Sequence, residues 1–284
     1  MTVARPVLRY HGGKWMLAPW IIEHMPSHRV YTEAFGGAAS VLMRKPRAHF
    51  VEIYNDLDSE ICNVFRVLRQ QESAQTLQHL LTITPFSREE FETSYEQTND
   101  PIEQARRTIV RSFMGFGSDS ASGAKTGFRA NGNRQGSHPS RDWVNYPANL
   151  QYFTQRLREV VIESRPAIEV ISQHDAPTTL HYCDPPYVLE TRSKHVTRDG
   201  KGYRHEMTNE QHAQLAEVLK KAKGMVLVSG YANDLYDREL FPDWVRVERQ
   251  ALADGALERT EVLWMNAACA AALESQEKQK RMFA

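Results

Sequence analysis

Four consecutive residues near the middle of the chain have the chemistry of an acceptor site. Asp184, Pro185, Pro186 and Tyr187 directly follow the apolar run LHYC. The prolines fix φ and lack a backbone N–H, so they predict a rigid turn that presents carbonyl oxygens and one carboxylate. Such a turn suits a ligand with two N–H donors, such as the exocyclic amino group of a nucleobase, and the tyrosine adds a face for stacking. A turn that merely ends a strand would leave the acid and the tyrosine without a role.

An earlier glycine turn has the pattern of a cofactor loop. The segment EAFGGAAS lies between a strand-like stretch and a helix start. It contains Phe35, Gly36, Gly37, Ala38 and Ser40. Glycines at such a turn let the backbone approach a nucleotide-like ligand at the start of a helix. By itself the turn is equally consistent with a connection in which small residues serve packing.

An acidic residue after the next strand strengthens this interpretation. Asp56 in EIYNDLD lies about 20 residues beyond the glycine turn, where an acid accepts hydrogen bonds from ribose hydroxyls. Asp58 and Glu52 are alternatives, although Asp58 precedes a helix and is better explained as its N-cap. The turn and the acid together predict an adenosine-bearing cofactor and do not separate NAD from S-adenosylmethionine.

The segments that position these residues alternate between strands and helices. The strand-like HRVYTEAF and HFVEIYND precede the helical SVLMRK and SEICNVFRVLRQ. A later half contains the helix LQYFTQRLREVV, the strand LHYC, the helix TNEQHAQLAEVLKKA and the strand MVLVSG. WVRVERQAL and RTEVLWMN follow as a strand pair, and ESQEKQKRMFA as a solvated tail. This alternation predicts an α/β fold with a parallel, doubly wound sheet.

Residues 76–149 interrupt the alternation. Two helical stretches lead into a long polar segment, and six of the fifteen glycines fall between positions 115 and 136. A segment of this length without regular structure inside a compact domain is typically functional. We therefore predict an inserted, mainly helical and loop domain at 76–149, within a catalytic domain formed by 1–75 and 150–284.

The composition fits an ordinary globular protein, with 41% hydrophobic and 25% charged residues. Basic and acidic residues balance at 35 each, which leaves nucleic acid open as a partner because clustering on one face matters there. Cys62, Cys183 and Cys269 show no CxxC spacing, so we expect a reducing compartment with neither a metal site nor disulfides. The lack of a long apolar stretch and of a signal-like N-terminus predicts a cytoplasmic protein without a membrane span.

Taken in order, these motifs resemble the Dam-like D12 class of S-adenosylmethionine-dependent DNA adenine N6-methyltransferases, in the form often carried by phages. The resemblance rests on RYHGGK, EAFGGAASV, NDLDSEI, YCDPPY, TNEQHAQLAEVL, VLVSGYANDLY and RTEVLWMN. It implies a Rossmann-like methyltransferase sheet with an inserted target-recognition domain. It also implies methyl transfer, without a metal, from S-adenosylmethionine to the N6 amino group of an adenine flipped out of double-stranded DNA. We expect a monomer or a weak dimer.

The resemblance also implies roles for single positions. Asp184 and the Pro185 carbonyl would accept hydrogen bonds from the adenine amino group, while Tyr187 stacks on the base. The cofactor-binding residues would be Tyr10, Lys14, Phe35, Gly36, Gly37, Ala38, Ser40, Asp56, His174 and Asp175. The last two belong to SQHD, at the place where the family contacts the adenine of the cofactor. Where the family pattern is EPFxGxGS, this chain has Ala34 and Ala39 in place of a proline and a glycine.

The polar segment of the insertion is where we expect DNA to be read. The residues predicted to bind DNA are Lys125, Arg129, Asn131, Arg134 and Arg141. Their cationic side chains suit phosphate contacts, and the asparagine and Arg129 can reach base edges. For any single one of these residues, a solvated flexible loop is the alternative explanation.

Three other functions compete with this hypothesis. A cytosine-N4 or RNA amino-methyltransferase would use the same acceptor turn, because the turn reads an amino group without naming the ring. A nicotinamide-dependent oxidoreductase would share the cofactor turn. A catalytically inactive DNA-binding protein is conceivable because of Ala39, whereas Glu33, Phe35, Gly37 and Ser40 keep the pattern of an active enzyme.

Overall fold

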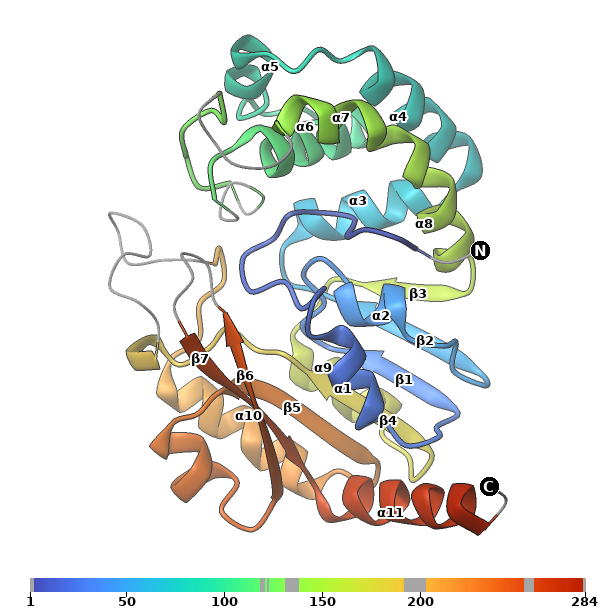
Figure 1. The fold of residues 1–284 in the computed structure, drawn as a ribbon, viewed down its shortest axis with the longest axis vertical. Helices are drawn as coiled ribbons and strands as arrows, with labels where there is room; N and C mark the ends of the chain where they lie inside the picture. Colours follow the sequence, from blue (N-terminus) through green and yellow to red (C-terminus); the bar gives the residue numbers. More distant parts are fainter. Residues whose placement is uncertain are drawn as a thin grey trace.

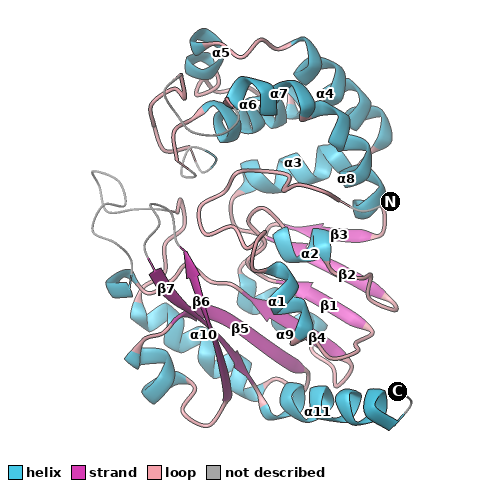
Figure 2. Cartoon of the chain, in the orientation of Figure 1, coloured by secondary structure: helices cyan, strands magenta, loops and turns pink. Residues whose placement is uncertain are grey.

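The computed structural model describes residues 3–117, 121, 123–130, 138–191, 203–252 and 258–282. Within these residues a seven-stranded sheet has the order β3-β2-β1-β4-β5-β7-β6 (Figures 1 and 2). The strands are β1 (Val30–Glu33), β2 (Val51–Asn55), β3 (Val160–Glu163), β4 (Thr179–Cys183), β5 (Met225–Tyr231), β6 (Val245–Leu252) and β7 (Glu258–Met265). The first five are parallel, and β7 pairs antiparallel with β5 and with β6. The predicted α/β fold and the predicted final strand pair are both confirmed.

The register aligns the carboxyl ends of the central strands. Glu33, the last residue of β1, lies opposite Tyr54 on β2 and Tyr182 on β4. Residues that directly follow these strands therefore meet at one edge of the sheet. In doubly wound sheets this carboxyl edge is where ligands bind.

Helices cover both faces of the sheet (Figure 1). One face carries α1 (Ala18–Glu23) and α2 (Ser40–Arg44), and the other carries α9 (Ala167–His174) and α10 (Asn209–Lys221). Alternate side chains of β5 point to opposite faces of the sheet. Leu227 packs into one buried cluster, and Val226 and Val228 pack into the other. This period of two is the pattern of a strand buried on both faces.

A helical region packs beside the β2 and β3 side of the sheet (Figure 2). Its helices are α3 (Ser59–Arg69), α4 (Gln71–Ile83), α5 (Arg88–Thr93), α6 (Pro101–Met114), α7 (Pro139–Asn145) and α8 (Leu150–Leu157). Phe65 of α3, Ile109 of α6 and Phe153 of α8 belong to the same buried cluster as Tyr54 of β2. Because α3 begins at Ser59 and α8 ends at Leu157, the helical region extends beyond the predicted bounds of 76–149 on both sides. The division into two domains stays a prediction.

Two segments differ from their predicted structures. Val160 and Val161, predicted to end a helix, begin β3, because α8 stops at Leu157. The predicted solvated tail belongs to α11 (Ala267–Met282), a mostly exposed helix whose Cys269 is buried. Three short helical segments complete the described elements: η2 (Pro147–Asn149), η3 (Leu189–Thr191) and η4 (Leu235–Leu240).

Candidate active site

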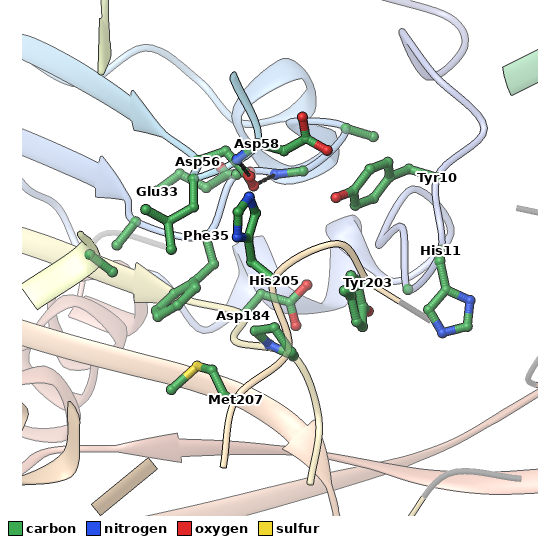
Figure 3. Close-up of a pocket in the computed structure, with 18 of the residues that line it drawn as sticks. Tyr10, His11, Glu33, Phe35, Asp56, Asp58, Asp184, Tyr203, His205 and Met207 are labelled. Carbon is green, nitrogen blue, oxygen red and sulfur yellow. Dashed lines mark hydrogen bonds between the residues drawn. The ribbon is translucent and has the colours of Figure 1, made fainter. Parts of the chain in front are cut away.

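A pocket lies at the carboxyl edge of β1, β2 and β4 (Figure 3). Ten of the residues predicted from the sequence line it: Tyr10, Lys14, Phe35, Gly36, Gly37, Ala38, Ser40, Asp56, Asp184 and Pro186. They come from three strand ends and from the segment before α1, so residues distant in the chain share one cavity. In Figure 3 the side chain of His205 points toward Asp56, and Tyr10 and Tyr203 lie on another wall.

The glycine turn follows β1 and is held close to β2. The Gly36 N–H donates to the Asn55 carbonyl at 2.7 Å, and the Tyr54 hydroxyl donates to the Gly37 carbonyl at 2.8 Å. A Cβ at Gly36 would lie 2.1 Å from the Tyr54 ring, and Gly37 has a φ of +46°. Both positions therefore require glycine. Ala39, which replaces the last glycine of the family pattern, also has a left-handed φ of 52°.

Asp56 receives two backbone hydrogen bonds beneath this turn. The N–H groups of Gly37 and Asp58 each donate to its carboxylate at 2.8 Å. Burial raises the pKa of Asp56 on balance, although these two hydrogen bonds act in the opposite direction. Asp58 itself caps α3 by accepting from the Glu60 and Ile61 N–H groups. The structure thus gives the two acids different positions, with Asp56 beside the glycine turn and Asp58 at the helix terminus.

Both carboxylate oxygens of Asp184 have partners. Oδ1 accepts from the Ser229 hydroxyl at 2.8 Å, and Oδ2 lies 3.1 Å from the Lys14 ammonium. Lys14 is 5% exposed and also donates to the Gly12 carbonyl at 2.6 Å. Burial alone would lower the pKa of Lys14, but the Asp184 and Glu261 carboxylates outweigh burial and raise the pKa. The lysine is therefore a buried cation held against the Asp184–Tyr187 turn.

Tyr187 lies behind this cation and does not line the pocket. The Lys14 ammonium sits 4.6 Å from the centre of its ring, and the Tyr231 ring meets it edge-on at 4.6 Å. The Tyr187 hydroxyl donates to Glu261 at 2.8 Å. Pro185 is buried and likewise lies outside the pocket lining. The tyrosine is thus adjacent to Asp184 as expected, but a lysine covers the face that we expected to be open.

His174 and Asp175 are not in the pocket. Asp175 follows α9 and accepts hydrogen bonds from the N–H groups of Lys223 and Gly224, just before β5 begins. These residues lie at the amino edge of the sheet, opposite the pocket. The helix α9 runs from the carboxyl edge to the amino edge of the sheet, and His174 and Asp175 lie at its far end. This placement corrects the expectation that the two residues contact the cofactor.

Two parts of the pocket wall are not predicted by the sequence patterns. Pro166, Ala167 and Ile168 line it after β3, and they were not predicted because the first two residues of β3 were assigned to a helix and the strand was not recognised. The segment 203–207 forms another wall, where the Arg204 guanidinium lies 3.0 Å from the Asp58 carboxylate. The available sequence signal was a short segment with Tyr203 and His205 between the catalytic turn and the next helix.

The described residues among those predicted to bind DNA do not line the pocket. Lys125 and Arg141 are exposed, the latter on α7, whereas the Arg129 guanidinium donates to the Phe113 carbonyl at the end of α6. Asn131 and Arg134 lie outside the described residues. Nothing in these contacts tests DNA binding, which stays a prediction.

The described residues contain neither a metal-binding cluster nor a membrane-spanning helix. No group of three or more His, Cys, Asp and Glu side chains in this part of the chain could hold a metal ion. None of the described helices combines the length and the apolar character needed to cross a membrane.

Comparisons with known proteins agree with the geometry. A family model described as "D12 class N6 adenine-specific DNA methyltransferase" matches residues 10–252. A DNA adenine methylase of Escherichia coli (strain K12) is 23% identical over 80% of this chain and 78% of its own length. DNA adenine methylases of Vibrio cholerae and Salmonella typhi are 21% and 22% identical over 85% and 88% of this chain, and 86% and 87% of their own lengths. The chain belongs to the D12 class of N6 adenine-specific DNA methyltransferases.

Proposed function

We propose that the pocket binds S-adenosylmethionine and that Asp184 receives the N6 amino group of an adenine flipped out of double-stranded DNA. The observation that carries the proposal is the meeting of the glycine turn, Asp56 and Asp184 at one edge of the sheet. Membership of the family already selects adenine in DNA over the cytosine, RNA and nicotinamide alternatives. The inactive-protein alternative rested on Ala39, which the turn accommodates in a left-handed conformation.

The residues of the pocket fit this cofactor. Asp56 supplies an acceptor for ribose hydroxyls at the end of β2. The Ser40 hydroxyl is buried, no described residue hydrogen bonds with it, and it lies on the pocket wall, so a polar group of the ligand can satisfy it. When bound, S-adenosylmethionine supplies a methyl group on a positively charged sulfur.

Asp184 acts by orienting the amino group. The N6 lone pair of adenine is delocalised into the ring and is a poor nucleophile. An acceptor at each N–H, from the Asp184 carboxylate and the Pro185 carbonyl, favours a pyramidal nitrogen and aims its lone pair. Alignment and local electrostatics then supply most of the catalysis. Because Lys14 lies 3.1 Å from Oδ2 of Asp184, the amino group must either share this carboxylate with the lysine or take its place.

The base reaches this site by leaving the DNA stack. Flipping costs a few kcal/mol, which stacking on Tyr187 and contacts to phosphates must offset. Lys125 and Arg141 are exposed and suited to such phosphate contacts. We infer that the helical region with its polar segment holds the duplex while the sheet edge holds the flipped base.

Binding calorimetry with S-adenosylhomocysteine tests the cofactor part. We expect the wild-type protein to bind this product, and NADH to give no binding heat. Asp56→Asn keeps the size of the side chain and removes its charge, and we expect it to weaken binding about tenfold, because hydrogen bonds to charged groups contribute about 1.5–3 kcal/mol. Binding of NADH, or equal affinity of the variant, would contradict the assignment of this pocket.

A further inference from the structure

A second buried carboxylate stands behind the catalytic turn, on β7. Glu261 is 6% exposed and lies opposite Tyr231 of β5 in the sheet register. One of its oxygens accepts the hydroxyl hydrogen bond of Tyr187 at 2.8 Å. It does not line the pocket, so its effect on bound molecules must pass through its neighbours.

The charges of Asp184 and of the described groups in contact with Asp184 or Tyr187 do not cancel. Lys14 is the cation against Asp184. Burial raises the pKa of Glu261 on balance, but Lys14 and the hydrogen bond from Tyr187 favour its charged form. Burial raises the pKa of Glu33, a further carboxyl that interacts with Asp184, to about 8, so it is mostly neutral at pH 7. One ammonium against two carboxylates leaves one net negative charge. Without Glu261 the net charge of these groups would be zero.

We propose that Glu261 is a positioning residue that fixes the Tyr187 ring through its hydroxyl and gives the catalytic turn the net negative charge that favours a cationic methyl donor. This inference rests on the proposed function of the pocket. The net charge of −1 complements the positive charge on the sulfur of S-adenosylmethionine. The sulfur of the product, S-adenosylhomocysteine, carries no charge. Since the interior screens charges weakly, a buried carboxylate is felt over several ångströms.

The same carboxylate explains how Lys14 can leave Asp184. An adenine whose ring stacks on Tyr187 where Lys14 lies, and whose amino group takes the lysine's place at Oδ2, displaces the ammonium from both. A buried ammonium without a counter-charge is costly. Glu261 accepts a hydrogen bond from Tyr187 and attracts Lys14. It therefore offers the displaced ammonium a second carboxylate within the same site.

The test compares the affinities of S-adenosylmethionine and S-adenosylhomocysteine by calorimetry in the absence of DNA. In Glu261→Gln, which keeps an acceptor for Tyr187, we expect the preference for the cationic ligand over the neutral one to fall about tenfold. The affinity for the neutral ligand should stay within about twofold. Glu248→Gln is the matched control, because Glu248 is an exposed carboxylate on β6, and it should leave both affinities unchanged.

Each result separates the two proposals. An unchanged preference in a Glu261→Gln variant that still binds both ligands overturns the role of Glu261 and leaves the pocket assignment intact. A wild-type protein that binds neither ligand overturns the proposed function, and this inference with it. A parallel loss of both affinities would indicate a structural role only, which also overturns the inference.

The hydrogen bond to Tyr187 has its own measurement. Tyr187→Phe removes the hydroxyl and keeps the ring, so it should raise the KM for duplex DNA. We expect Glu261→Ala to raise the same KM, and the double variant to be no worse than the more affected single variant. Fully additive effects would show that the two side chains do not act through this hydrogen bond.

Discussion

Asp56 and Asp175 make nearly the same local contacts at opposite ends of one sheet. Each is half-buried and directly follows a regular element, and each accepts two backbone N–H hydrogen bonds, at 2.8 Å for Asp56 and 2.9 Å for Asp175. Asp56 lies at the carboxyl edge and lines the pocket, whereas Asp175 lies at the amino edge and does not. Residue type and hydrogen bonding therefore do not distinguish a binding acid from a structural one.

The electrostatic surroundings of the two acids do differ. Burial raises the pKa of Asp56 on balance. Burial alone would also raise the pKa of Asp175, but hydrogen bonds from Lys223, Gly224 and His181 outweigh it and lower the pKa. A carboxylate with a lowered pKa stabilises the fold, whereas a carboxylate with a pKa raised by burial has free energy to gain from ligand donors.

The largest expected difference is in cofactor affinity. We expect Asp56→Ala to weaken S-adenosylhomocysteine binding about 100-fold, since the ligand hydroxyls lose a charged acceptor, at about 1.5–3 kcal/mol. Asp175→Ala should leave the affinity within about twofold. Calorimetry on both variants measures this. Equal losses would remove the distinction between the two edges.

A third acid at the carboxyl edge, Glu33, should make the free energy of unfolding depend on pH. Glu33 accepts from the Tyr31 hydroxyl and the Leu42 N–H, and burial raises its pKa from 4.5 to about 8. The folded protein thus binds this proton more tightly than the unfolded chain does. Its contribution to stability is full below pH 4.5 and is lost as the pH rises through about 8. Between pH 6 and pH 9 we expect a loss on the order of 2 kcal/mol, measured by urea unfolding.

Glu33→Gln is the control for this pH dependence. The variant has no carboxyl group to titrate at this position, so its free energy of unfolding should fall less between the same two pH values. An unchanged pH dependence would show that Glu33 is already ionised in the folded protein.

The amino-edge acid should matter for stability. Asp175→Ala leaves the N–H groups of Lys223 and Gly224 without their acceptor and removes the contact to the buried His181. We expect a loss of about 1–2 kcal/mol in the free energy of unfolding, with the turnover number per folded molecule unchanged. A lower turnover number in the folded variant would contradict a purely structural role.

The smallest effect is expected at the glycine turn. Ala39 has a left-handed φ of 52°, which costs a non-glycine residue about 1–2 kcal/mol. Ala39→Gly relieves that strain but increases the entropy of the unfolded chain, so we expect a net gain of about 0.5–1 kcal/mol. Thermal unfolding measures it. A lower melting temperature would show that packing of the buried methyl group outweighs the strain.

The parts of the site that directly follow strands could be predicted from the sequence. Asp56, Gly37 and Asp184 were predicted because each comes just after a recognisable apolar strand and parallel strands place such residues at one edge. His174 and Asp175 were misplaced because β3 has four residues and continues the apolar pattern of the helix before it. Because β3 was not recognised in the sequence, the direction in which the helix ending at His174 crosses the sheet could not be predicted.

Other contacts depend on the path of the chain in space. The segment 203–207 reaches the pocket through a link between Arg204 and Asp58, 146 residues apart in sequence, which no local pattern encodes. The contact of Lys14 with Tyr187 is a similar case, because nothing in the motifs RYHGGK and DPPY indicates that they lie together in space. Glu261 belonged to a recognised motif, but its partner on the catalytic turn became visible only in the packed structure.

The most direct test of the account is methyl transfer to duplex DNA. The wild-type protein should incorporate label from S-[methyl-³H]adenosylmethionine at the N6 position of adenine. Asp184→Ala should lower the rate about 10³-fold while it still binds S-adenosylhomocysteine, because the cofactor wall is intact and only the acceptor of the amino group is lost. Retention of a rate within about tenfold of wild type would contradict the central claim that Asp184 orients the target amino group.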